Sequence, residues 1–235
     1  MFNRISSLTL AILLFLTFFG SRNYHYILLA AVVFMILASL AINYRRLNFT
    51  WPHLLLPILY LVGVASVFAV IASFKLQVIF LISASLVLYV LEMKLGHESH
   101  FLQNIFLLSV FAWYMGLFAL QLYIRLPVIW LILVVFSSTY LFGIQGFAGF
   151  SLPAKKYFYM LLAMICAEAA WGLSFWPTHF FVDAFVLFCI FYLIWLFAFS
   201  AFFGKLSKAK IYWQMTWVAF AIIIVLGSAT WRPLK

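Results

Sequence analysis

The sequence predicts an all-α protein, a polytopic transmembrane helical bundle of about nine spans with a cytoplasmic amino terminus. Hydrophobic residues make up 69% of the chain and charged residues only 8%, against about 25% charged residues in ordinary soluble domains. The apolar residues form separate runs near the length that a helix needs to cross hydrocarbon. These runs lack the alternation of a membrane β-barrel, so we expect helices, which satisfy their own backbone hydrogen bonds.

The runs place the nine expected spans at residues 5–19, 26–43, 52–73, 76–92, 101–124, 127–142, 157–174, 178–203 and 211–229. The first run is short and follows Arg4, which resembles a signal peptide. The Phe-Phe-Gly-Ser-Arg segment after it lacks the small-x-small pattern of a cleavage site, so we interpret this run as a membrane anchor.

Basic residues set the expected orientation and exclude nucleic acid as a partner. The net charge is +10, but the 14 Lys and Arg residues are scattered between apolar runs rather than gathered in a basic face. Nine of them fall on the amino-terminal side of the nine spans and five on the other side. The amino terminus is therefore expected in the cytoplasm, with the cations contacting lipid headgroups of the plasma (inner) membrane.

The connections are short, so we expect residues 1–235 to form a single integral membrane domain without a soluble domain. The two longest expected loops cover residues 93–100 and 143–156. The second is rich in glycine, but it lacks the spacing and the Gly-Lys-Ser/Thr ending of a phosphate-binding loop. We interpret it as a flexible connector, because Gly and Pro mark loops generally.

The main candidate site is the hairpin that runs from Glu168 to Asp183. Glu168 interrupts an apolar span, and ionisable residues inside a membrane are functional candidates by default. If the chain turns at Trp176 to Thr178, Glu168 and Asp183 lie about 12 Å and about 8 Å below the turn. His179 and Asp183 are i,i+4 neighbours, so these groups could converge with Trp171 on a substrate or proton site.

Each of these residues also has an ordinary structural interpretation. A carboxylate at Asp183 suits the start of a helix, and Trp171, Trp176 and His179 suit the interfacial belt. Glu168 could instead hydrogen-bond a neighbouring helix. On the same helix, a row of small residues suits close packing, namely Cys166, Ala170 and Ser174.

No metal site is predicted, and the sequence leaves any cofactor unknown. His97, Glu98 and His100 share one loop but lack the His-Glu-x-x-His order. We interpret that loop as a solvated turn, with Glu92 and Lys94 as an interfacial pair or as headgroup contacts. The two cysteines, Cys166 and Cys189, fall inside expected spans, where free thiols behave as small hydrophobes.

Motif patterns for transport or catalysis are weak. The segments 47–53 and 173–179 both contain Trp-Pro before a span, which would fit an inverted repeat, but interfacial preferences explain the likeness equally well. There is no nucleophile elbow, and the hydroxyls of Ser137, Ser138 and Thr139 have no adjacent base. We interpret them as helix-packing groups.

Three function classes remain, and we rank a non-catalytic membrane subunit or scaffold first. The 29 Phe and nine Trp residues offer broad surfaces for partner helices or lipid, so a membrane-protein partner is expected. A proton-coupled or hydrophobic-substrate transporter that uses Glu168 is second, since the polar inventory of the spans is thin. An enzyme acting on a lipid-linked substrate, with Glu168 or Asp183 as general base, is third.

Overall fold

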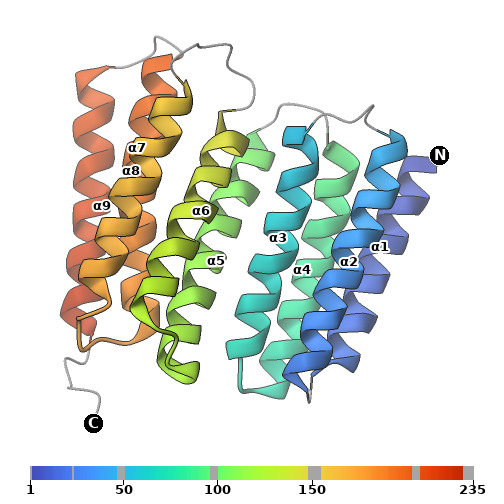
Figure 1. The fold of residues 1–235 in the computed structure, drawn as a ribbon. Helices are drawn as coiled ribbons and strands as arrows, with labels where there is room; N and C mark the ends of the chain where they lie inside the picture. The colour runs from blue at the N-terminus through green and yellow to red at the C-terminus, as the bar shows by residue number, and fades with distance from the viewer. Residues whose placement is uncertain are drawn as a thin grey trace. The chain divides into compact units, whose positions relative to one another are not determined.

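The computed structural model describes residues 2–22, 24–46, 51–95, 100–147, 155–202 and 207–229. Within these ranges it contains nine α-helices and no strand (Figure 1), which confirms the predicted all-helical fold. Each expected span corresponds to one helix, although the third helix ends at Val70 rather than at residue 73 and the eighth begins at Phe180 rather than at residue 178. The helices are α1 (Phe2–Gly20), α2 (His25–Arg46), α3 (Trp51–Val70), α4 (Phe74–Lys94), α5 (His100–Ile124), α6 (Val128–Gly146), α7 (Lys155–Leu173), α8 (Phe180–Phe202) and α9 (Lys208–Ser228).

Six of these helices are long and apolar enough to cross a membrane, within the described residues: α2, α4, α5, α6, α8 and α9. Shorter apolar stretches lie in α1 and α3, at Arg4–Gly20 and Leu55–Val70. Helix α7 carries three charged residues, Lys155, Lys156 and Glu168. The chain is thus a helical membrane protein. The orientation and the count of nine spans stay predictions.

Contacts divide the chain into two compact units, Met1–Trp113 and Tyr114–Lys235, with the boundary inside α5. In the first unit, α1 packs mainly against α4, while α2 contacts α1 and α3. The ends of α1 and α4 are joined by the Arg22 guanidinium, whose Cζ lies 4.3 Å from the centroid of the Phe74 ring. Between α3 and α4, the Tyr60 hydroxyl donates a 2.7 Å hydrogen bond to the Ala84 carbonyl.

The second unit is a run of neighbouring helices, in which α7 packs against α6 and α8, and α8 packs against α9 (Figure 1). Its centre is a set of edge-on rings. The Tyr114 centroid lies 6.0 Å from Phe142 and 6.3 Å from Phe191, which lie 6.1 Å from each other. The Tyr114 hydroxyl and Thr139 Oγ1 share a 2.7 Å hydrogen bond, so this polar pair is enclosed by aromatic surface.

Helices α6 and α7 are in close contact at Gly143. A Cβ placed on Gly143 would lie 3.0 Å from Tyr159 Cδ1 and 3.1 Å from Tyr159 Cβ. On the α7 side, the expected small-residue row is mostly internal: Cys166 and Ala170 are fully buried and Ser174 is half-buried. The missing side chain at Gly143 is therefore what lets the Tyr159 ring pack against α6.

Replacement of Gly143 by Ala should lower stability by about 1–3 kcal/mol, because the added methyl group must displace Tyr159 from a packed interface. The measurement is thermal unfolding of the purified protein in detergent. Gly227→Ala is the matched control, since nothing lies within 4 Å of the Cβ position at Gly227. Equal melting of the Gly143→Ala variant and the control would contradict the packing argument.

Candidate functional site

Glu168 lies on the outward face of α7. The inward face of this helix is formed by buried residues, namely Tyr159, Leu162, Ala163, Cys166, Ala167, Ala170 and Leu173. Glu168 is exposed, on a stripe that otherwise consists of large apolar side chains. These are Tyr157, Met160, Leu161, Met164, Trp171 and Phe175, each between 44% and 79% exposed. In the described part of the chain, no hydrogen bond or ion pair engages Glu168.

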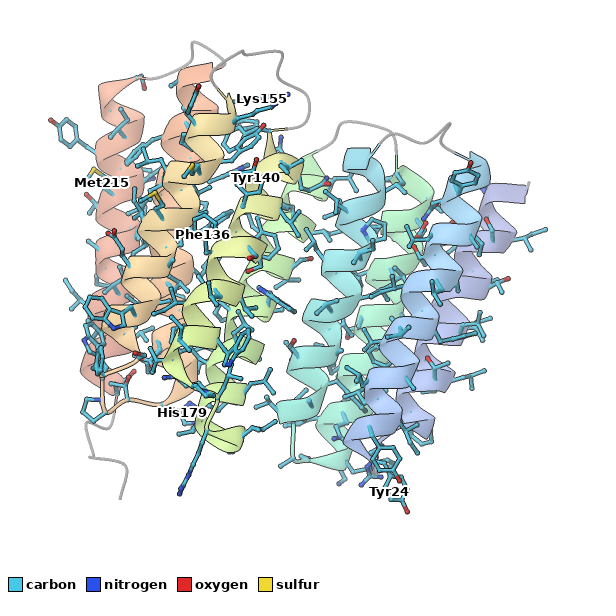
Figure 2. All side chains as sticks on the ribbon, viewed as in Figure 1. Tyr24, Phe136, Tyr140, Lys155, His179 and Met215 are labelled. Carbon is cyan, nitrogen blue, oxygen red and sulfur yellow. The ribbon has the colours of Figure 1, made fainter. Side chains whose placement is uncertain are left out.

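The depth of Glu168 follows from the helix rise. It lies thirteen residues after Lys155 and five before Leu173, which corresponds to about 20 Å and about 7.5 Å along the axis. Lys155 and His179 mark the two opposite ends of the α7–α8 hairpin (Figure 2). Glu168 is therefore within the helix, nearer to the His179 end.

Asp183 is held at the start of α8 by its own segment. The Thr178 hydroxyl donates a 2.5 Å hydrogen bond to Asp183 Oδ1, and both residues are buried, 4% and 6% exposed. Asp183 lies in the first turn of α8, where the helix dipole favours a negative charge. The Asp183 carboxylate is therefore stabilised locally by this hydroxyl and by the helix dipole.

His179 takes a different partner from Asp183, although the two are i,i+4 neighbours. The Phe181 backbone N–H donates a 3.3 Å hydrogen bond to His179 Nδ1, and the imidazole centroid lies 4.0 Å from the Phe180 ring. The His179 side chain is exposed, as is Trp171. Among the described contacts, no hydrogen bond joins Glu168, His179 and Asp183 to one another.

A second carboxylate, Glu92, is the centre of a buried polar cluster in the first unit. Its Oε1 accepts hydrogen bonds from Ser39 Oγ at 2.9 Å and from Asn43 Nδ2 at 3.2 Å, and its Oε2 accepts one from Asn43 Nδ2 at 2.9 Å. Glu92 is 0% exposed, Asn43 1% and Ser39 2%. The interpretation of Glu92 as a headgroup contact was therefore wrong, because the side chain points between helices rather than to the membrane surface.

Sequence reasoning missed this cluster, although one signal was present. Ser39 and Asn43 are four residues apart in α2, so they lie on one face of an apolar helix. Such a polar pair inside a span indicates a partner on a neighbouring helix. That the partner is Glu92, near the end of α4, depends on how the helices pack.

Several hydroxyl groups inside the helices have local partners, whereas Ser85 Oγ is buried without one among the described residues. Ser66, Ser83 and Ser138 each donate to the backbone carbonyl four residues earlier, while Thr139 bonds Tyr114. Cys166 and Cys189 are free and buried. These hydroxyls and thiols therefore serve packing within and between helices.

The described residues contain no group of three or more His, Cys, Asp or Glu side chains that could hold a metal ion. Residues 96–99 lie outside the described ranges, so the interpretation of the loop with His97, Glu98 and His100 stays a prediction. The same holds for the glycine-rich connector at 148–154 and for the segment 47–50 of the proposed repeat. Helix α6 continues to Gly146, beyond the expected start of the connector at residue 143.

Comparison of the chain with protein-family models, with curated proteins and with solved structures gave no match.

Replacement of Asn43 by Ala should destabilise the protein by about 1–3 kcal/mol, because the buried Glu92 carboxylate loses the amide that bonds both of its oxygens. Thermal unfolding in detergent measures the effect. Ser83→Ala on α4 is the control, since the exposed Ser83 hydroxyl bonds only within its helix. In a double-mutant cycle, Asn43→Ala should cost less in a Glu92→Gln background. Additive effects would contradict the direct coupling.

Proposed function

We propose that this protein is a non-catalytic membrane subunit, which assembles with another membrane polypeptide through the outward face of α7. The observation that carries the proposal is Glu168, a carboxylate without a described partner in the middle of an exposed apolar stripe. Met164 precedes it by one turn and Trp171 follows it by one turn.

Lipid is an unfavourable neighbour for this face. A carboxylate at the bilayer centre costs about 2.5–3.5 kcal/mol on insertion scales, which is the upper bound for Glu168 because it lies nearer to one end of α7. Ionisable residues inside a span usually face a protein interior, a cavity or a partner. The internal face of α7 is filled by apolar side chains, so within its own unit Glu168 has no interior to face. A partner helix would supply both the polar contact and the apolar cover.

The transport and enzyme hypotheses require a different geometry. A carrier needs polar groups around an internal site, whereas Glu168 is exposed and Asp183 is bonded to Thr178. Glu92 is internal, but three hydrogen bonds from Ser39 and Asn43 already use its oxygens. An enzyme would need a general base within hydrogen-bond distance of a substrate atom. The subunit hypothesis explains the outward position of Glu168, so we rank it first. We further propose that the protein lies in the plasma (inner) membrane.

Helix α9 adds a second apolar surface to the same unit. Of its described side chains only Val218 is buried, while Trp213, Trp217 and Ile223 are 61%, 52% and 68% exposed. Between Ile211 and Ser228 this helix has no Asp, Glu, Lys, Arg or His residue, so lipid can cover this surface without burying a charge. The contrast makes α7, rather than α9, the better candidate for a specific contact.

Native mass spectrometry of the protein released gently from its own membranes should detect a stable complex with a second polypeptide, because lipid cannot satisfy Glu168. The same preparation washed with a harsher detergent is the control for loss of the complex. A lone or purely homo-oligomeric species that carries a small molecule would contradict the subunit proposal and would support a carrier or enzyme.

A further inference from the structure

We infer that the partner contact at Glu168 is a transmembrane helix that presents a Lys or Arg side chain at the depth of this carboxylate. The inference rests on the proposed function, because it names the chemistry of the partner that α7 would bind.

The surface around Glu168 suits a helix rather than a loop or a small solute. Its exposed stripe runs the length of α7, from Tyr157 at one end to Phe175 past the other. Gly172 lies one turn after Glu168 on the same exposed face, and nothing lies within 4 Å of its Cβ position. A small residue beside a polar one lets two membrane helices approach closely enough for a hydrogen bond between them.

Charge complementarity selects a cation as the opposing group. Glu168 can accept hydrogen bonds at two oxygens, and Arg or Lys binds a carboxylate with charge-assisted bonds that are stronger than neutral ones. In a medium of low dielectric constant, this advantage is larger than it is in water. The apolar flanks Met164 and Trp171 would exclude water from the pair.

A second copy of this chain does not offer such a cation. In the described helices the Lys and Arg residues lie within the first or last three positions, as Arg4, Lys75, Lys94, Lys156 and Lys210 do. Glu168 lies five residues inside α7. Two copies that met along this stripe with a twofold axis would bring two carboxylates together, which is unfavourable. The occupant is therefore a different polypeptide.

Site-specific cross-linking in native membranes tests the contact. A photoreactive side chain at Met164 or Trp171 should capture the partner seen by native mass spectrometry. Peptide sequencing should place the adduct on an apolar segment with a Lys or Arg within about one helical turn. The same probe at Ile224 on α9 is the control and should capture lipid, since Ile224 is 52% exposed on the other surface.

Charge variants then test the pairing itself. Glu168→Gln should weaken the complex about tenfold, because it removes the charge from the hydrogen-bonded pair, and Glu168→Lys should abolish it. Exchange of the partner's basic residue for Glu should restore binding to Glu168→Lys. Lys156→Gln, which removes a charge from the exposed end of the same helix, should leave the complex unchanged. Unaltered melting of the Glu168 variants would show that the loss is not caused by unfolding.

The outcomes separate this inference from the proposed function. A stable complex that Glu168→Gln leaves unchanged, or a cross-linked segment without a cation, overturns the inference while the subunit function stands. A cross-link to a second copy, or to residues 1–113 of the same chain, also overturns it. Absence of any second polypeptide in the native complex overturns both.

Discussion

The hydrocarbon interior of a membrane offers no hydrogen-bond partners, and this constraint organises the described part of the molecule. Backbone groups are satisfied within helices, and small hydroxyls such as Ser66 and Ser138 return to the carbonyl four residues earlier. Larger polar groups pair across helices, as Glu92 does with Asn43. A charged side chain on the outward face of a membrane helix therefore indicates a hydrogen-bond partner outside its own unit.

Close packing has to hold the helices together, because lipid tails are as apolar as the side chains. Moving a side chain from lipid to a helix interface therefore brings no hydrophobic gain. Close packing, rather than the hydrophobic effect, is therefore the main attraction between these helices. In the second unit, Gly143 admits the Tyr159 ring between α6 and α7. In the first unit, a Cβ on Gly63 would lie 3.1 Å from Ala112 Cβ, so α3 and α5 meet at small residues as well.

Length and apolarity predicted the helices well, since a span must be long and apolar wherever it lies in the bundle. They could not predict which side of each helix faces inward, because a helix that is apolar all round has no clear periodicity. Glu168 was thus recognised as an anomaly, but its outward position was not. Glu92 was misread since it lies two residues before the end of α4, where a headgroup contact is the usual expectation.

Glu92 and Glu168 both need a hydrogen-bond partner in the membrane, but they lie in different surroundings. Glu92 is enclosed and is bonded by side chains of its own unit, so its interactions contribute to the stability of the chain. Glu168 lies on an exposed stripe that is apolar on both sides, so under the proposed function its interaction energy would contribute to the binding of a partner. The apolar residues of the stripe would contribute affinity for many helices. A helix without a cation at the depth of Glu168 would leave the carboxylate unpaired in the complex. This cost would lower its affinity, so the carboxylate would make binding specific for a helix with a cation.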